Sequence, residues 1–408
     1  MAEIDTSLSE EGRIKEEYQL WRKNCRYMYS FVSETALTWP SLTVQWLPQY
    51  KENKEERCVE SKLLLGTHTS GEDTNYVKVA STQLPFSKKE GSSEQGADNG
   101  KKASSAIKIT KKFANSYEVN RCRYMPQEPQ VAATINGEGE IDIYDLDGDK
   151  KTSVHHITTH DANGYGLCWN PLKKGHLLTS SDDKTAAVTD ISNGSPTTAY
   201  RIQSHNDIVN DAKWSPFNEN VFGSVSDDKY LHIFDLRESR DPVMKAYVPD
   251  SGGINTLSFS QFSPNLVATG NSSSTINLID MRRLSANEGN TRGLLHTMMG
   301  HADAITSLEF SPHNDEILGS GSQDRRLILW DLLKIGEEQT QEDAEDGCPE
   351  LFMMHAGHTS SVMDFSWCPY RNWTIASVAD DNIVHLWEVD KKLLENESSV
   401  DLQGVELE

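Results

Sequence analysis

Histidine, serine and aspartate recur together in this sequence, in the combination that serves nucleophilic catalysis. One such set is His301, Ser320 and Asp324, and a Ser–His–Asp triad would make the chain a hydrolase. The set recurs in several segments of similar length, however, and one triad is enough for an enzyme. We therefore predict a structural hydrogen-bond network, in which each histidine bridges a turn aspartate and a strand serine, and no catalytic residues.

Other patterns that carry chemistry are missing from the sequence. Gly137, Glu138 and Gly139 indicate a hairpin turn rather than a dinucleotide loop, because no helix follows them. The sequence has no P-loop, no H-E-x-x-H motif, no EF-hand and no acetyl-CoA-binding signature. Its six cysteines include no C-x-x-C pair, which argues against a zinc site or a disulfide framework and favours a reducing compartment. We expect a non-enzyme with no metal and no other cofactor.

An internal repeat indicates which elements position these residues. Six short β-type segments end in an acidic residue, namely Asp145, Asp190, Asp235, Asp280, Asp331 and Glu388. The intervals between these acids are 45, 45, 45, 51 and 57 residues, about the length of one four-stranded propeller blade. A second marker stands 30 residues before each acid, at Asn115, His160, His205, Asp250, His301 and His358. Because that interval is constant, the length variation falls in loops between blades.

These two phases resemble the WD repeat, whose GH…WD pattern is best kept at Gly300–His301 and Trp330–Asp331. A poorer copy at residues 41–84 brings the number of blades to seven. We predict an all-β fold, a seven-bladed WD-repeat β-propeller over residues 35–390 with an N-terminal α-helix packed on its side. Closure of such a ring removes exposed sheet edges.

Residues 1–34 lie before the repeat and contain the predicted helix. One stripe at helical spacing consists of Ile14, Tyr18, Trp21, Cys25, Met28 and Val32. A second stripe consists of Leu20, Asn24, Tyr27 and Phe31. Either both stripes are buried against the ring, or the helix packs with the first edge and offers the second to a partner.

An insertion before the last blade, residues 336–355, combines acidic and apolar residues. Seven acids and no base are followed by Leu351, Phe352, Met353 and Met354. A charge run alone is typical of a solvated loop, but acids beside bulky apolar side chains suit a basic amphipathic helix. Because the first and last blades of a propeller are neighbours, the helix and this loop could form two walls of one groove.

The net charge of −23, from 62 acids and 39 bases, repels nucleic acid and anionic membranes and attracts basic partners; solubility alone is the other reading. No apolar run is long enough for a membrane span, and the polar N-terminus is unlike a signal peptide. Residues 87–105 are predicted to be a disordered insertion rather than a nuclear signal. Residues 391–408 are predicted to be an acidic tail.

Several phrases carry a more specific resemblance over nearly the whole chain. They are SETALTWPSLTVQWLP, LLLGTHTSGE, RCRYMPQEP, IGEEQTQEDAEDGCPEL and HAGHTSSVMDFSW, and they resemble the retinoblastoma-associated histone-binding WD-repeat family. Within it, SETALTWPSLTVQWLP and VAATINGEG are most similar to the fungal branch that serves type B histone acetyltransferases. The resemblance implies a non-catalytic histone H3–H4 chaperone.

The resemblance also implies a site for the first helix of histone H4 between the N-terminal helix and the acidic loop. The matched positions supply apolar contacts at Tyr27, Met28, Phe31, Met353 and Met354 and acidic contacts at Glu342, Asp343 and Asp346. Leu20, on the same helix stripe, and Leu351, in the same apolar run, are added to this site.

A second site is implied on the flat top of the ring, where the family binds the histone H3 tail and similar basic peptides. Glu118, Asn120, Tyr165 and Asn255 match the family there. Asn163, Asn210 and Ala304 stand where family members carry Glu, so we expect the site to be weakened or retuned.

The resemblance implies a regulatory subunit that binds histones H4 and H3 in cytoplasm and nucleus and presents the H4 tail to the catalytic subunit of the type B acetyltransferase. The alternative is a histone-binding subunit of a chromatin assembly factor or a histone deacetylase complex. A general scaffold would instead show no preference for H4. Direct contact with nucleic acid or with a membrane is not expected.

Overall fold

The structure is a computed structural model that describes residues 9–86, 107–238, 240–286, 291–341, 344 and 347–398, with side chains as far as residue 394. The predicted insertion at 87–105 and the part of the predicted tail from residue 399 lie outside the described residues. Residues 391–398 form helix α3 (Lys391–Ser398). Among the described residues, no helix has both the length and the apolar character to cross a bilayer.

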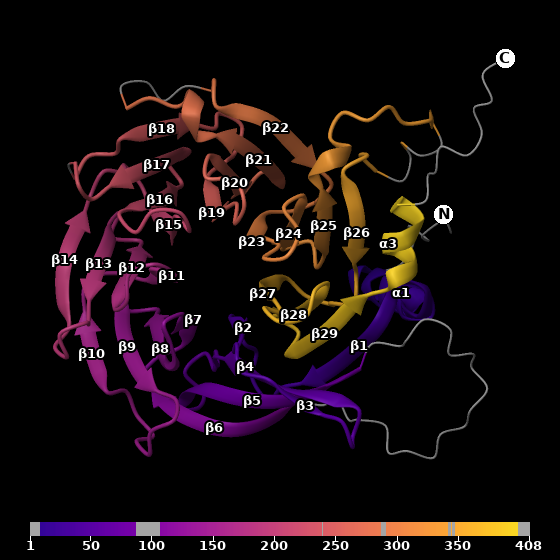
Figure 1. Ribbon diagram of the computed structural model, residues 1–408, viewed down its shortest axis with the longest axis horizontal. Helices are drawn as coiled ribbons and strands as arrows, with labels where there is room; N and C mark the ends of the chain where they lie inside the picture. The colour runs from indigo at the N-terminus through magenta and orange to yellow at the C-terminus, as the bar shows by residue number, and fades with distance from the viewer. Residues whose placement is uncertain are drawn as a thin grey trace.

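Seven antiparallel sheets stand around a central axis, which confirms the predicted propeller (Figure 1). Blades 1 to 4 consist of β2 (Val44–Trp46), β4 (Cys58–Leu65), β5 (Asn75–Pro85) and β6 (Lys108–Asn115), with β3 (Lys51–Asn53) beside β4; β7 (Val119–Met125), β8 (Glu128–Asn136), β9 (Glu140–Asp145) and β10 (His155–Thr158); β11 (Gly164–Trp169), β12 (His176–Ser181), β13 (Ala186–Asp190) and β14 (Thr197–Ile202); and β15 (Val209–Trp214), β16 (Val221–Ser226), β17 (Tyr230–Asp235) and β18 (Met244–Tyr247).

The remaining blades follow the same order from the axis outward. Blades 5 to 7 consist of β19 (Ile254–Phe259), β20 (Leu266–Asn271), β21 (Thr275–Asp280) and β22 (Leu294–Met299); β23 (Ile305–Phe310), β24 (Ile317–Ser322), β25 (Leu327–Asp331) and β26 (Leu351–His355); and β27 (Val362–Trp367), β28 (Thr374–Ala379), β29 (Ile383–Val389) and β1 (Tyr29–Ala36). Short 3-10 helices follow β21 (Met281–Arg283) and β25 (Leu332–Lys334). The hydrophobic core lies in layers between neighbouring blades, because both faces of each sheet are covered.

The recurring histidines form the predicted network inside the blades. His301 Nδ1 lies 2.8 Å from an Asp324 carboxylate oxygen, and its Nε2 lies 2.7 Å from Ser320 Oγ. The Trp330 indole donates to the same Oγ at 2.8 Å. Equivalent networks surround His160, His205 and His358. Burial alone would raise the pKa of Asp228, but the hydrogen bond from His205 lowers it to about 2.

The last blade takes its outer strand from the N-terminal segment. β1 pairs antiparallel with β29, from Tyr29 beside Val389 to Ala36 beside Ile383. The prediction of helix as far as residue 34 was therefore wrong: α1 (Glu10–Met28) ends where β1 begins. Without β1 the backbone of β29 would present an unpaired edge, and a segment that alternates apolar and polar residues supplies the missing ladder.

Local sequence explains where α1 begins and how it docks. Ser9 caps the helix by accepting a hydrogen bond from the Gly12 amide, and Glu10 and Glu11 stand favourably at the positive end of the helix dipole. Trp21 of the first stripe is buried, with 5 % of its surface exposed, as the stripe predicted.

Candidate functional site

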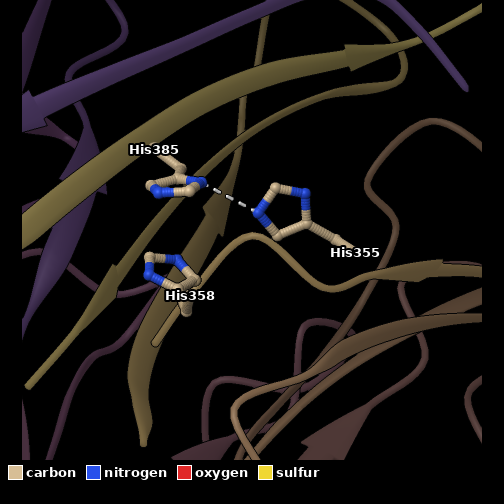
Figure 2. Close-up of side chains that lie close together, drawn as sticks. All are labelled: His355, His358 and His385. Carbon is tan, nitrogen blue, oxygen red and sulfur yellow. Dashed lines mark hydrogen bonds between the residues drawn. The ribbon is translucent and has the colours of Figure 1, made fainter. Parts of the chain in front are cut away.

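A buried chain of polar contacts anchors α1 to the ring. The Trp21 indole donates to the Tyr29 hydroxyl at 3.0 Å, and that hydroxyl lies 2.7 Å from His355 Nδ1. His355 Nε2 in turn lies 3.1 Å from His385 Nδ1, the contact drawn in Figure 2. Since His355 ends β26 and Trp21 lies on α1, the chain ties the helix to the strand that follows the acidic insertion.

Three buried histidines in this region raise the question of a metal site. Ring nitrogens of His355, His358 and His385 lie within 4.8 Å of one another (Figure 2). Both nitrogens of His355 are already engaged, and those of His358 contact Asp381 and Ser377 as in the other blades. Burial lowers the pKa of His355 and of His385 well below the usual range, so both rings are neutral. The cluster is organised as a hydrogen-bond network in which, among the described residues, only Nε2 of His385 lacks a hydrogen-bond partner.

One edge of α1 remains open. Leu20 exposes 50 % of its surface and Tyr27 exposes 61 %, although both are large and apolar. The Arg26 guanidinium lies 4.6 Å from the centre of the Tyr27 ring. The second stripe is therefore not fully buried, and its helical part is the edge available to a partner.

A cavity runs along the same edge of α1, which we call the α1 groove. Its volume is about 600 Å³, and Arg13 and Glu17 of α1 line it opposite Met354 of β26. Spacings of four and three residues place Leu20 on this edge after Glu17. Glu17 bridges Arg325 and Arg326 of blade 6, at 2.9 and 2.6 Å, which holds the helix beside the blade.

Four predicted H4 contacts lie in other surroundings than the sequence suggested. Residues 351–355 form the outer strand of blade 6 rather than a loop, and Met353 is only 4 % exposed in the cluster that contains Trp21. Leu351 is half-buried against the core of blade 6. Phe31 belongs to β1 and packs between blades 7 and 1, and Met28 packs on the Trp21 cluster. The prediction that Met353 faces a partner is wrong, because ring closure buries it, whereas Phe31 is half-buried in a strand rather than on a helix stripe.

The acidic part of the site is described only at its edges. Glu342, Asp343 and Asp346 lie outside the described residues. Glu337 and Glu338 are exposed. Glu350, the last acid of the run, is buried and contacts His296 at 2.8 Å; it therefore serves the blade rather than a ligand.

The matched top-face residues form a connected polar surface at the end of the ring that carries the turns between second and third strands. The Asn120 amide donates to Asn163 Oδ1 at 3.0 Å, and the Asn163 amide donates to the Tyr165 hydroxyl at 2.8 Å. Asn255 donates to the Ile305 carbonyl and accepts from Ser272. Glu118 is half-buried and directly precedes β7 in the sequence.

Two carboxylates outside the predicted set of top-face residues stand at this surface. Tyr165 contacts Asp182 at 3.5 Å, and the Asn210 amide donates to Asp227 at 2.7 Å. Burial and then the charge of Asp227 raise the pKa of Asp182, which shows that the two acids are electrostatic neighbours. Carboxylates of turn residues thus stand beside Asn210 and, through Tyr165, close to Asn163. The signal was present in the sequence, since each of these acids directly precedes a turn aspartate.

Comparisons with known proteins agree with this arrangement. The family described as the histone-binding protein RBBP4, or the C subunit of the CAF1 complex, matches residues 16–86, which include the open edge of α1 from Leu20 onward. The WD domain, G-beta repeat, matches residues 196–235, 292–331 and 350–388.

Full-length relatives give the more specific result. A protein of Debaryomyces hansenii named histone acetyltransferase type B subunit 2 is 64 % identical over 97 % of this chain and 95 % of its own length. Proteins of the same name from Candida albicans and Schizosaccharomyces pombe are 57 % and 40 % identical, over 95 % and 94 % of this chain and 95 % and 92 % of their own length. The chain belongs to the family of the histone acetyltransferase type B subunit 2 proteins.

Proposed function

We propose that this chain is the non-catalytic, histone-binding subunit of a type B histone acetyltransferase. It binds the first helix of histone H4 at the α1 groove and acts as a chaperone for histones H3 and H4. The names of the relatives and the histone-binding family that matches α1 support the partner class. The histidine sets support a non-catalytic role, because they repeat around the ring as buried structural networks.

The observation that carries the proposal is the open edge of α1. Leu20 and Tyr27 are half or more exposed on a helix that is otherwise anchored firmly. Large exposed apolar side chains on one edge of a helix are typical of a binding surface. The neighbouring insertion is acidic, as Glu337 and Glu338 show. An apolar edge next to acids fits a basic amphipathic helix.

Binding of the H4 helix explains how a subunit without chemistry supports acetylation. A histone held by its first helix keeps its tail close to a catalytic subunit in the same complex. Tethering of this kind replaces a bimolecular encounter by an intramolecular one, at an effective concentration set by the length of the tether. The propeller then acts as the rigid holder of the substrate.

Calorimetric titration with a peptide of the first H4 helix tests the proposal. Tyr27→Ala is expected to weaken binding by more than about 1 kcal/mol, as truncation of an exposed aromatic anchor does. The melting temperature of this variant should stay that of the native chain, because Tyr27 is 61 % exposed. Leu333→Ala is the matched control, since Leu333 is 76 % exposed on blade 6 outside the groove.

Two results would contradict the proposal. One is equal binding of the H4 peptide and of a scrambled peptide of the same charge, which would identify a general acidic scaffold. The other is unchanged affinity in Tyr27→Ala. Co-purification with a deacetylase rather than an acetyltransferase would favour the alternative complex without affecting the H4 site.

A further inference from the structure

The chain of polar contacts that anchors α1 ends at a buried nitrogen atom. His385 is fully buried, and its Nδ1 lies 3.1 Å from His355 Nε2. Its second ring nitrogen, Nε2, points away from His355 (Figure 2) and has no hydrogen-bond partner among the residues that the structure describes. A buried polar atom without a partner costs free energy, so the surroundings of this nitrogen are expected to supply one.

The direction of the hydrogen bonds in this chain follows from the Trp21 indole, which can only donate. The Tyr29 oxygen accepts from it at 3.0 Å, so the Tyr29 hydroxyl proton goes to the remaining partner, His355 Nδ1, at 2.7 Å. Burial lowers the pKa of His355 and of His385 well below the usual range, and a neutral histidine that accepts at Nδ1 carries its proton on Nε2. His355 Nε2 therefore donates to His385 Nδ1, and His385 carries its own proton on the unpartnered Nε2. The opposite direction would leave the Tyr29 proton without an acceptor.

Glu34 stands at the end of this chain. It lies directly opposite His385 in the pairing of β1 with β29, and directly opposite residues of an antiparallel pair share one face of the sheet. The Glu34 Oε1 atom is 3.9 Å from His385 Nε2. Because the Glu34 side chain is 33 % exposed and the His385 side chain is not exposed at all, the carboxylate is the group that can move. A shift of about 1 Å brings the two atoms to the distance of an N–H···O hydrogen bond.

The same carboxylate returns the chain to α1. The Tyr18 hydroxyl donates to the two Glu34 oxygens at 2.9 and 3.1 Å. Tyr18 and Trp21 are three residues apart and therefore lie on the same side of the helix. Two polar attachments one turn apart fix the rotation of α1 about its own axis, and this rotation decides where the open edge with Leu20 and Tyr27 points.

We propose that Glu34 is a positioning residue for the H4 site, as the last acceptor of a one-way hydrogen-bond relay through Trp21, Tyr29, His355 and His385, which we call the α1 relay. Glu34 accepts from His385 and from Tyr18 and so holds α1 in the rotation that presents Leu20 and Tyr27 to the histone helix. It acts through these two side chains and not by contact with the histone. The inference rests on the proposed function, since the open edge of α1 is the H4 site proposed above.

The first test is the proton position in the two rings, measured by nitrogen NMR on the full chain with labelled histidine. His355 and His385 are both expected to carry the proton on Nε2, with a bare Nδ1. Single asparagine variants at 355 and 385 assign the two signals among the 13 histidines. A proton on Nδ1 of either ring overturns the relay, because the hydrogen bonds would then run in the other direction.

The second test is calorimetric titration of Glu34 variants with the peptide of the first H4 helix. Glu34→Ala should weaken binding at least about fivefold, because α1 loses one of its two attachments and the binding edge is held less precisely. The melting temperature should change little, since the side chain is partly exposed. Glu34→Gln should stay within about twofold of the native chain, because its amide oxygen still accepts from His385 and Tyr18.

The glutamine variant also controls for charge, because it removes the same negative charge as the alanine variant. Glu60→Ala is the matched control on another blade, where a half-buried strand glutamate accepts from the Asn53 amide at 3.1 Å; it should bind H4 normally. Equal losses in Glu34→Ala and Glu34→Gln, or a similar loss in Glu60→Ala, overturn the inference, because the histone would then respond to net charge.

Tyr27→Ala separates this inference from the proposed function. Native affinity in Glu34→Ala together with weakened binding in Tyr27→Ala overturns the positioning role and leaves the H4 site in place. Native affinity in both variants overturns the site itself, and the positioning role with it.

Discussion

At the scale of single residues, the buried hydroxyl of Tyr29 connects the helix to the ring. It accepts from Trp21 and faces His355 Nδ1, and Tyr29 is only 5 % exposed. Tyr29→Phe leaves an indole N–H and a ring nitrogen without partners, which costs about 1–3 kcal/mol of unfolding free energy in urea. Tyr18→Phe is the control, because its hydroxyl contacts Glu34 at the surface. Equal stability of the two variants would contradict this role.

A second residue-scale prediction concerns pH. Burial, and then the neighbouring His205, lowers the pKa of His232 to about 3, whereas an unfolded histidine titrates at about 6.5. Below about pH 6.5 the unfolded chain therefore binds a proton that the folded chain does not. The stability that this group contributes is full above that pH and is lost as pH falls toward about 3.

The measurement is the slope of unfolding free energy against pH between about 7 and 5. His232→Asn should reduce that slope by up to about 1.4 kcal/mol per pH unit. Asparagine is a suitable replacement, since Asn277 occupies the equivalent buried position of blade 5. An unchanged slope would show that His232 takes up its proton as readily in the folded protein as in the unfolded chain.

At the scale of elements, the strand assignment of β1 and β26 changes what mutations should do. Met353→Ala is expected to lower stability by about 2–5 kcal/mol, because the side chain is buried in the Trp21 cluster. Phe31→Ala should lower stability by less, since Phe31 is half-buried. Neither should weaken H4 binding directly at temperatures where the protein is folded.

Tyr27→Ala provides the contrast for this prediction, with normal melting and weakened binding. Melting curves and calorimetry on the same three samples separate the two kinds of effect. If Met353→Ala melted like the native chain and lost H4 binding, β26 would have to detach from β25 when the histone binds.

At the scale of the whole molecule, acidic side chains on the top face of the ring set which peptides can bind there. This face holds Asp182 and Asp227 within a network of asparagines. Basic peptides such as the H3 tail should therefore bind at the top. Asp182→Asn with Asp227→Asn should weaken that binding, and the loss should be largest at low salt, where screening is weakest.

Titrations of an H3 tail peptide at low and physiological salt check this prediction. H4 helix binding in the same double variant is the control, because the α1 groove lies at blades 6 and 7, whereas Asp182 and Asp227 belong to blades 3 and 4. Native affinity of the double variant at low salt would show that these carboxylates do not take part.

Much of the architecture follows from the sequence alone. The intervals between successive acids such as Asp235 and Asp280 indicated the blade length, and the recurrence of the histidine set separated structural histidines from catalytic ones. A repeat is a local signal, since each blade contains its own network and its own strands. The anchored face of α1 was also predictable, because Trp21 stands in a stripe at helical spacing.

Only the tertiary structure decided which residues close the ring and which remain accessible. Tyr29 and His355 are separated by 326 residues in the chain, and no local pattern reports that they meet. Phe31 continues a helical stripe in the sequence, yet the unpaired edge of β29 draws it into a strand, because backbone hydrogen bonds at an open edge outweigh helix periodicity. Met353 follows a run of acidic residues in the sequence, but pairing with β25 buries it. Side-chain exposure depends on contacts between distant segments, and those contacts exist only once all seven blades have closed.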